Sequence, residues 1–466
     1  MPEQTPERLS ARRILALVAD PDTFAELPPP ARQSGPDGPL GWQGYDASRA
    51  RAAERTGEEE SVVVGTARIE GTAAVLIAFE FGFLGGSLGE RTGDRLEAAY
   101  VHARAHRLPV VPLVATGGSR MQEGMLALSQ LQRVARQSTL TREAGLPQIA
   151  VLRDPTTGGG WATLGAGADV VLALPGAQVG FAGSRVRPPD ADPAAYTAQA
   201  QLAAGAVDAV VPLAELRTVL GLWLRLLTAP ATDPADPPAA LGATGLPDTG
   251  QPDTDLTDTG LPATGWVAVR RARSPQRPRA HAYLDAYFTR RVALVGDRCG
   301  GADPDGMLCG FGERNGRTIA FAAQTGAATR PAGYRTAARL IRLADRLDIP
   351  VLTLVDTPGA ANDADAERQG AGAAIAELFG EVAAARMPIT TLVIGEGGSG
   401  GALALAAPGN TWATPDSYFS VIAPELAAAI LKRPPEEVEA TADQLRIRPQ
   451  DLVELGVVRG IVTPLP

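Results

Sequence analysis

The sequence predicts an α/β fold made of two similar units in tandem, each of about 200 residues. Three observations support this prediction. Short apolar stretches alternate with amphipathic helical stretches, Gly-rich loops follow strand ends in the same order in both halves, and a segment rich in Pro, Gly, Asp and Thr separates the halves. With 466 residues and 45% hydrophobic content, the chain can form more than one core.

The first half opens on an expected strand pair. SVVVGTARI and TAAVLIAFEF are apolar, β-branched runs that turn at Glu70-Gly71. A helix is expected in GERTGDRLEAAYVHARAHR, a buried strand in LPVVPLVAT, and a second helix over about 121–138. The strands PQIAVLRD and ADVVLALP follow, with the Gly loop PTTGGG after the first of them. Strands that alternate with helices in this way imply crossover connections.

The second half repeats this pattern. RVALVGDR and RTIAFAAQ precede the expected helix GYRTAARLIRLADRL, and the strands IPVLTLVDT and PITTLVIGE end in the loops PGAANDADAERQG and GGSGGA. The predicted organisation is an N-terminal segment over 1–60, a first α/β domain over 61–228, a flexible linker over 229–265 and a second α/β domain over 266–466. The linker is expected because its composition offers little apolar surface to bury.

Composition disfavours several classes of function. A net charge of -9 disfavours nucleic-acid binding, and no apolar run approaches the roughly 18–20 residues that a membrane span needs. The N-terminus shows no apolar signal region, so a cytoplasmic protein is expected. Two cysteines and three histidines also make a metal site unexpected.

The Gly cluster GEGGSGGA, over 395–402, fits several patterns. A dinucleotide fingerprint is disfavoured because Pro408-Gly409 cuts the following helix short. A nucleophile elbow at Ser399 lacks a histidine after it, since the last one is His281. Tight helix–sheet packing remains open as an explanation. The favoured interpretation is an oxyanion hole of backbone N–H groups, because Gly loops of this kind recur in both halves.

Ordered motifs in both halves resemble one known family. In chain order, the motifs of the first half are FEFGFLGGSLGE, ATGGSRMQEG, GLPQIAVLRDPTTGGG and GAQVGFAGSRV. Those of the second half are ARSPQRPRAHAYLDAYF, RPAGYRTAARLIRLADRLDIPVLTLVDTPGA, IGEGGSGGALAL and YFSVIAPELAAAILK. Together they resemble the motifs of the acetyl-CoA carboxylase carboxyltransferases. The chain is similar to the bacterial β and α subunits fused into one polypeptide. The resemblance implies a crotonase-like fold in both halves.

The resemblance also implies the reaction and the partners. CO2 would move from carboxybiotin to acetyl-CoA or a related short acyl-CoA, giving malonyl-CoA for fatty acid biosynthesis through an enolate. The first half would hold the acyl-CoA and the second half the biotin. Biotin would arrive on a separate biotin carboxyl carrier protein, recharged by a biotin carboxylase, because the single lysine, Lys432, does not lie in a biotinylation context. A homodimer is expected.

The family's functional positions can be carried over residue by residue. Gly117 and Gly118 would donate their N–H groups to the thioester carbonyl, and Gly401 and Ala402 would face the ureido oxygen of biotin. Further positions follow from the same motifs: Gly398, Ser399 and Gly400 for biotin, and Gly85, Gly86, Ser87, Ser119, Arg120, Gly158 and Gly159 for the acyl-CoA.

Some features depart from the family pattern. The four-cysteine zinc ribbon of the β subunit is absent, DTPGAAND stands where DTPGAYPG is usual, and Ser119 replaces an alanine. A decarboxylase, a carboxylase for another acyl-CoA such as propionyl-CoA, an inactive scaffold and an acyl-CoA hydrolase remain alternatives. The basic stretch 270–291, Arg185 and Arg187 are candidates for CoA phosphate contacts, with a solvated surface as the other interpretation.

Overall fold

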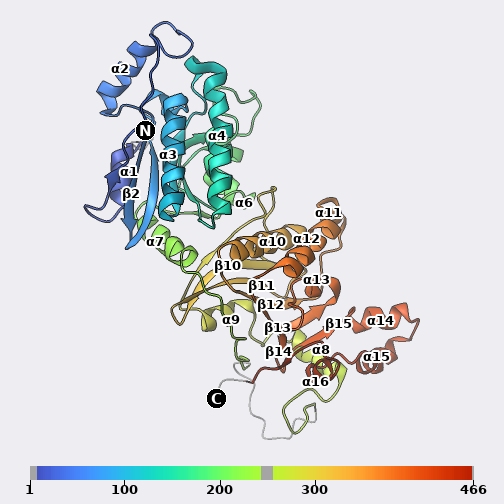
Figure 1. Cartoon of the computed structure of the whole chain (residues 1–466). Helices are drawn as coiled ribbons and strands as arrows, with labels where there is room; N and C mark the ends of the chain where they lie inside the picture. The colour runs from blue at the N-terminus through green and yellow to red at the C-terminus, as the bar shows by residue number, and fades with distance from the viewer. Residues whose placement is uncertain (1–7, 243–254, 464–466) are drawn as a thin grey trace, which may run out of the picture. The chain divides into compact units, whose positions relative to one another are not determined.

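The computed structural model describes residues 8–242 and 255–463, and the chain divides into two compact units. Unit 1 is the part up to Thr228 together with Arg298–Gly300, and unit 2 is Ala229–Asp297 together with the chain from Gly301 onward. Within the described residues each unit contains one eight-stranded mixed sheet with helices packed on it (Figure 1).

The sheet of unit 1 has the strand order β1-β2-β3-β4-β5-β6-β8, with β7 beside the end of β5. The expected hairpin forms, and its turn residues Glu70 and Gly71 have φ values of 50° and 83°. From β3 onward the strands of the main order are parallel, so their carboxyl ends share one edge. The strands are β1 Ala25–Glu26, β2 Val62–Ile69, β3 Thr72–Phe79, β4 Val110–Thr116, β5 Ile149–Thr157, β6 Val170–Ala173, β7 Val179–Gly180 and β8 Ala209–Val210.

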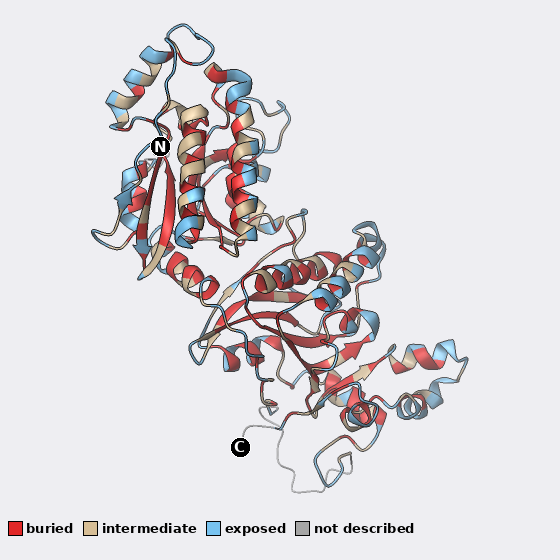
Figure 2. Cartoon of the chain, in the orientation of Figure 1, coloured by how far each residue is buried: buried red, intermediate tan, exposed pale blue. Residues whose placement is uncertain are grey.

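Two long helices, α3 and α4, lie side by side over the sheet of unit 1, with buried faces toward the strands (Figures 1 and 2). Leu96, Ala99 and Tyr100 of α3 join Val75, Ile77 and strand neighbours in the core. The helical segments of the unit are α1 Ala11–Val18, α2 Tyr45–Thr56, η1 Leu84–Gly86, α3 Glu90–His106, η2 Met121–Glu123, α4 Gly124–Glu143, α5 Gly158–Gly160, η3 Trp161–Gly165, η4 Pro193–Tyr196, α6 Ala198–Ala203 and α7 Leu216–Leu227.

The sheet of unit 2 repeats the same order, β9-β10-β11-β12-β13-β14-β16, with β15 beside the end of β13. Its β10–β11 hairpin turns at Asn315 and Gly316, which again both have positive φ values. The strands are β9 Arg290–Ala293, β10 Met307–Arg314, β11 Arg317–Gln324, β12 Val351–Thr357, β13 Ile389–Gly398, β14 Thr411–Ala413, β15 Tyr418–Ser420 and β16 Gly460–Ile461.

Helix α10 of unit 2 is largely buried (Figure 2), and Ala337, Leu340 and Ile341 are among its buried residues. The helical segments are α8 Gly265–Arg273, α9 Ala280–Tyr287, α10 Pro331–Arg346, α11 Ala364–Arg368, α12 Ala371–Ala384, α13 Ser399–Leu403, α14 Pro424–Ile430, η5 Pro435–Glu437, α15 Val438–Gln444 and α16 Pro449–Glu454.

The internal duplication extends to an irregularity in each sheet. The β4–β5 register shifts between Val114 and Thr116, and the β12–β13 register shifts between Val355 and Thr357. The two strands that end in Gly loops are therefore bent at the same place in both units. The predicted duplication of one α/β unit is confirmed.

The described ends of the expected linker contradict the expectation of flexibility. Ala235 and Ala240 are buried in the core of unit 2, and the Tyr287 hydroxyl donates to the Asp236 carbonyl at 2.7 Å. On the other side, Arg270 pairs with Asp255 at 2.7 Å. The composition argument overlooked that small alanines and backbone carbonyls can pack against a neighbouring surface. Residues 243–254, the middle of the expected linker, lie outside the described residues.

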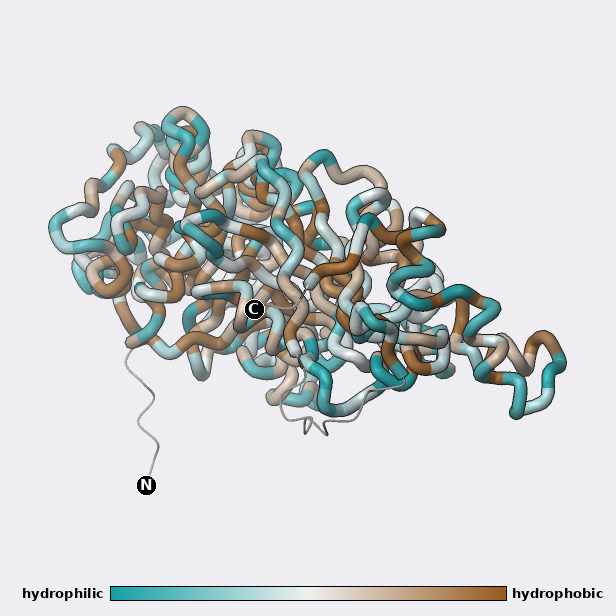
Figure 3. Tube along the Cα trace, turned by 90° about the horizontal axis from the view of Figure 1, so that it is seen from below, coloured by the Kyte–Doolittle hydropathy of each residue, from teal (hydrophilic) through white to brown (hydrophobic). Residues whose placement is uncertain are grey.

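No helix in the described part of the chain is long and apolar enough to cross a membrane. Hydrophobic stretches of the trace are short and interrupted by hydrophilic residues (Figure 3).

Candidate active site

In unit 1 the loop after β4 is tied to the segment that precedes α3. Gly117 N–H donates to the Gly85 carbonyl at 2.9 Å, and Leu88 N–H donates to the Gly118 carbonyl at 2.9 Å. Gly118 N–H donates to the Thr116 hydroxyl at 3.1 Å. The structure thus brings the predicted segments 85–87 and 117–120 together. It also shows that the N–H groups of Gly117 and Gly118 already have acceptors within unit 1.

A second Gly loop follows β5 and touches the first. A Cβ atom on Gly158 would lie 3.3 Å from Gly118 Cα, and the φ of Gly158 is 63°, a value that favours glycine. Gly158 N–H donates to the Phe181 carbonyl at 3.0 Å. The N–H groups of Gly159 and Gly160, by contrast, have no acceptor among the described residues.

Arg120 lies beneath these loops rather than on the surface. Its side chain is 1% exposed and forms an ion pair with Glu60, which is equally buried. The guanidinium also donates to the Ser87 hydroxyl at 3.1 Å and to the Ser87 carbonyl at 2.8 Å. Burial alone lowers the pKa of Arg120, but Glu60 raises it by more, so the guanidinium stays charged. Through these contacts the Arg120 side chain holds the segments at Ser87 and Glu60 together and so supports the loop.

Glu123, at the end of the same motif, is an acceptor for neighbouring elements. Its carboxylate accepts hydrogen bonds from the Tyr45 hydroxyl at 2.5 Å and from the Glu90 N–H at 2.5 Å. Tyr45 belongs to α2, so the N-terminal segment contributes directly to the support of this loop. The sequence offered no local signal for that contact because Tyr45 lies 78 residues before Glu123.

Unit 2 repeats the arrangement of the first loop. Gly359 N–H donates to the Thr357 hydroxyl at 3.2 Å, and Thr329 N–H donates to the Gly359 carbonyl at 3.2 Å. These contacts match those of Gly118 in unit 1. By this correspondence and by the strand registers, Gly158–Gly160 of unit 1 match Ser399–Gly401 of unit 2.

The predicted biotin positions 398–402 form the end of β13 and the start of α13. Ser399 has a φ of 59°, close to that of its counterpart Gly158. The Gly401 N–H has no acceptor among the described residues, whereas the Ala402 N–H makes the first intrahelical bond of α13, to the Gly398 carbonyl. A Cβ atom on Gly398 would lie 2.0 Å from the Pro358 carbonyl oxygen, whereas one on Gly400 would meet nothing within 4 Å. The loop is therefore closely packed at Gly398 and open at Gly400.

A buried ion cluster supports the Gly loop of the second unit. Asp356 is fully buried and accepts from Arg277 at 2.5 Å and from Arg279 at 3.2 Å. It also accepts the Glu396 N–H at 3.2 Å, opposite the bend in β13. Gly395 is required there because a Cβ atom would lie 2.3 Å from the carboxylate. A charged residue inside an otherwise apolar strand was the available signal for this cluster.

Most arginines of the basic stretch 270–291 are already ion-paired. Besides Arg277 and Arg279, Arg271 pairs with Asp416, Arg291 pairs with Asp285, and Arg273 pairs with Glu396 and Glu425. Near the Gly loops of unit 1, Arg187 stacks over Tyr196 at 3.6 Å from the ring centroid, whereas Arg185 is exposed.

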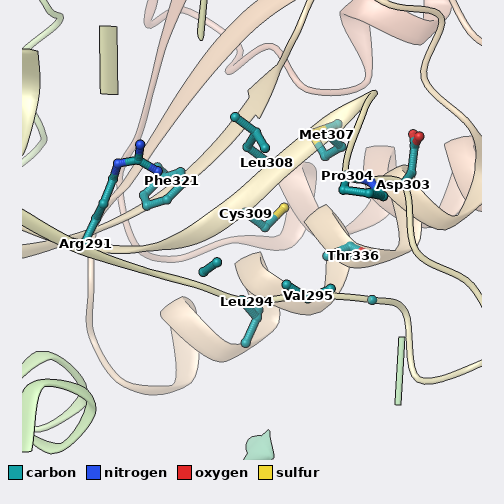
Figure 4. A pocket seen from close by; sticks show the side chains of 12 residues that line it. Arg291, Leu294, Val295, Asp303, Pro304, Met307, Leu308, Cys309, Phe321 and Thr336 are labelled. Carbon is teal, nitrogen blue, oxygen red and sulfur yellow. The ribbon is translucent and has the colours of Figure 1, made fainter. Parts of the chain in front are cut away.

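A cavity of about 70 Å³ lies between β9, β10 and α10 (Figure 4). Its walls are mainly apolar, with Cys309 and Asp303 among the lining side chains. Burial raises the pKa of both groups, so burial favours their neutral forms. Of the predicted site positions, only Arg291 of the basic stretch 270–291 lines this cavity. In the described part of the chain, no cluster of three or more His, Cys, Asp or Glu is placed to hold a metal ion.

Comparison with known proteins matches each half of the chain to a carboxyltransferase family. Residues 42–211 match the family described as carboxyl transferase domain, and residues 262–465 match the family described as acetyl co-enzyme A carboxylase carboxyltransferase-like. The chain is 39% identical over 474 residues to the acetyl-coenzyme A carboxylase carboxyl transferase subunits beta/alpha of Salinispora arenicola, covering 98% of this chain and 82% of that protein. It is 34% identical to a biotin-dependent acyl-coenzyme A carboxylase beta3 subunit of Mycobacterium bovis, covering 91% and 83%.

Solved structures share the fold. A transcarboxylase 12S structure superposes with a TM-score of 0.75 at 20% identity, covering 98% of this chain and 87% of that one. A single-chain long-chain acyl-CoA carboxylase gives a TM-score of 0.72 at 20% identity, covering 98% of this chain and 46% of that one. These likenesses confirm the expected pair of crotonase-like α/β folds.

Proposed function

The chain belongs to the acetyl-CoA carboxylase carboxyltransferase family, and from that premise we propose that it moves a carboxyl group from carboxybiotin to acetyl-CoA or a related short acyl-CoA. The observation that carries this proposal is a matched pair of loops whose N–H groups lack an internal acceptor, one in each unit. Such groups stabilise an oxygen that becomes negative during the reaction. The enzyme is a carboxyltransferase, and each of its two units contributes one of the loops.

In unit 1 we propose that Gly159 and Gly160 donate to the thioester carbonyl. Gly117 and Gly118 then serve as the supporting loop, because their own N–H groups are engaged by Gly85 and Thr116. When the substrate loses its α-proton, negative charge develops on the thioester oxygen. Preformed donors stabilise that charge without reorganising, and each contributes roughly 3–4 kcal/mol.

The acyl-CoA is proposed to lie along the segment that precedes α3. Gly85, Gly86, Ser87 and Ser119 border the loop of unit 1, with Arg120 as their buried support. Arg185 is the better candidate for a CoA phosphate, because it is exposed while most arginines of 270–291 already face carboxylates.

In unit 2 we propose that Gly401 donates to the ureido oxygen of biotin beside Ala402, with Gly398, Ser399 and Gly400 shaping the approach. The Gly401 N–H fits this role because it is free of an internal acceptor. When bound, carboxybiotin supplies the carboxyl group and a basic ureido nitrogen. The chain's contribution is to orient that ring and to polarise its oxygen.

The proposed partners are a separate biotin carboxyl carrier protein and a biotin carboxylase, in the cytoplasm. Lys432, the single lysine, follows α14 and lies far in sequence from any methionine pair. Biotin therefore has no attachment context on this chain.

A homodimer is proposed from exposed apolar residues beside both Gly loops. Phe181 follows β7 with 73% exposure, and Val421 follows β15 at the matching place with 72% exposure. Val186 and Leu426 extend these two patches a few residues further along. Apolar surface of this kind marks contact sites. A second copy that pairs the patch of unit 1 with the patch of unit 2 would cover both.

Replacing Phe181 and Val421 with aspartate is expected to convert the dimer to a monomer, because two charges would be buried in the contact. Sedimentation velocity of the full chain measures the change. Val101→Asp is the control, since Val101 is also an exposed apolar residue but lies on α3, and it should leave the dimer intact. A double variant that sediments like the parent would refute this interface.

The function is tested with the full chain, malonyl-CoA and biocytin. Transfer in reverse should yield acetyl-CoA and carboxybiocytin, with consumption of malonyl-CoA dependent on biocytin, and methylmalonyl-CoA compared in parallel. Loss of malonyl-CoA without biocytin would indicate a decarboxylase. Release of free CoA would indicate a hydrolase, and either result would overturn the proposal.

A further inference from the structure

Two arginines of unit 1, Arg49 and Arg91, are left without an acceptor. Neither guanidinium forms a hydrogen bond or an ion pair with a described residue, although Arg49 lies 5.8 Å from the centre of the Tyr45 ring. Both side chains are half-buried, and the Nε atom of each is buried without an acceptor. A buried N–H group that water does not reach is costly to leave unpaired. The two side chains therefore indicate an acceptor from outside the chain.

The neighbouring carboxylates do not neutralise these two charges. The acidic residues that follow α2 or begin α3, Glu58, Glu59, Glu60 and Glu90, form ion pairs with four other arginines. Arg91 also lies in the first turn of α3, where the helix dipole disfavours a positive charge. An anion bound beside it would offset that unfavourable placement.

Both arginines border the segment 84–88, which is proposed to line the acyl-CoA. Helix α2, which carries Arg49, packs against η1 at the start of this segment. Helix α3, which has Arg91 as its second residue, begins directly after the segment. A Cβ atom on Gly85 would meet nothing within 4 Å, so the segment is open on that side. The unpaired charges thus lie beside the proposed path of the substrate.

The matching place in unit 2 offers no such charge. The second residue of α10 is Ala332, which is only 3% exposed. Arg330, at the start of that helix, already pairs with Asp363 at 3.1 Å. The difference agrees with the proposed division of the substrates, because CoA carries phosphate groups and biotin carries none.

We infer that Arg49 and Arg91 form an anion site for the phosphate groups of the acyl-CoA. This inference rests on the proposed function. CoA has a pyrophosphate and a ribose 3′-phosphate, and a guanidinium can donate two parallel N–H groups to phosphate oxygens, Nε–H among them. The phosphates are separated from the thioester by the pantetheine arm. These arginines therefore contribute to the affinity for the substrate and not to turnover.

The test measures KM for malonyl-CoA at saturating biocytin. Arg49→Gln and Arg91→Gln are each expected to raise this KM about 10-fold, with kcat changed less than about twofold. Arg136→Gln is the matched control, because Arg136 is an exposed arginine on α4 of the same unit and its loss changes the net charge equally. The control should keep KM within about twofold of the parent. An unchanged KM in both test variants would overturn the inference.

Malonyl-pantetheine, which has no phosphate, separates phosphate binding from a merely structural effect. The parent and both variants should have equal KM values for it, and a rise as large as that for malonyl-CoA would refute the inference. Malonyl-3′-dephospho-CoA then identifies the phosphate. A variant effect that disappears with this substrate assigns the ribose 3′-phosphate, and an effect that persists assigns the pyrophosphate.

Calorimetric titration of the full chain with CoA measures the same contacts without turnover. Both variants should bind CoA about 10-fold more weakly than the parent and Arg136→Gln. Equal affinities would overturn the inference and leave the proposed function standing. A parent enzyme that binds CoA but transfers no carboxyl group would instead count against the proposed function.

Discussion

Gly401→Ala is expected to reduce carboxyl transfer by about 10²–10³-fold while the chain stays folded. The new Cβ atom would approach the Ala360 nitrogen and the Tyr334 hydroxyl at 2.5 Å, so the peptide that carries the donor must move. Loss of one oxyanion donor has an effect of this size in other enzymes. Steady-state turnover of malonyl-CoA with biocytin measures the loss, and circular dichroism checks the fold.

Gly372→Ala is the matched control for this experiment. A Cβ atom on Gly372, which lies on α12, would meet nothing within 4 Å, and Gly372 is not among the residues with positive φ. Its activity should stay within about threefold of the parent. Equal losses in both variants would contradict a specific role for the Gly401 peptide.

Glu60→Gln is expected to destabilise unit 1 by about 3–5 kcal/mol, because the buried Arg120 guanidinium loses its charged partner. Glu59→Gln is the control one residue away. Glu59 has 83% side-chain exposure and pairs with Arg95 at 3.4 Å, so its loss should change the free energy of unfolding by less than about 1 kcal/mol. Urea unfolding of both variants gives the comparison. Similar values for the two would contradict the importance of the buried pair.

The same pair predicts a dependence on pH. Burial alone raises the pKa of Glu60, but Arg120 and the Ser61 N–H together bring it below its ordinary value. The stabilisation is therefore complete above the pKa of the unfolded chain and is lost as the pH falls through the lower, folded-state pKa. The difference in unfolding free energy between the parent and Glu60→Gln should shrink across that acidic range. A difference that stays constant across this pH range would show that the charge of Glu60 is not the source of the stabilisation.

Local patterns predicted much of the fold. The hairpin β2–β3 and the helices α3, α4 and α10 occur where periodicity and turn chemistry placed them. Strand β10 was missed, because Gly310 and Gly312 interrupt its apolar run. Gly310 is there because its strand neighbour approaches closely: a Cβ atom would lie 2.0 Å from the Val292 carbonyl oxygen. This steric requirement arises only in the folded sheet, so the local sequence shows no helix or strand periodicity that would reveal it.

The candidate site was predictable in part. The Gly loops were visible as motifs, but which of their N–H groups are engaged depends on partners such as Gly85 and Thr116. Arg120 and Asp356 are residues whose role depends on distant partners, since Glu60 is 60 residues away and Arg277 is 79 residues away. Contacts of that separation follow from topology and cannot be obtained from spacing in the sequence.

The threonine at the end of the second strand of each parallel set, Thr116 of β4 in one half and Thr357 of β12 in the other, secures its loop through its own hydroxyl. Each copy is thus anchored by a residue of the same half. A mutation that changes the contacts to the thioester can therefore leave the contacts to the urea group unchanged. The duplicated architecture thus allows the two binding loops of one reaction to be altered separately.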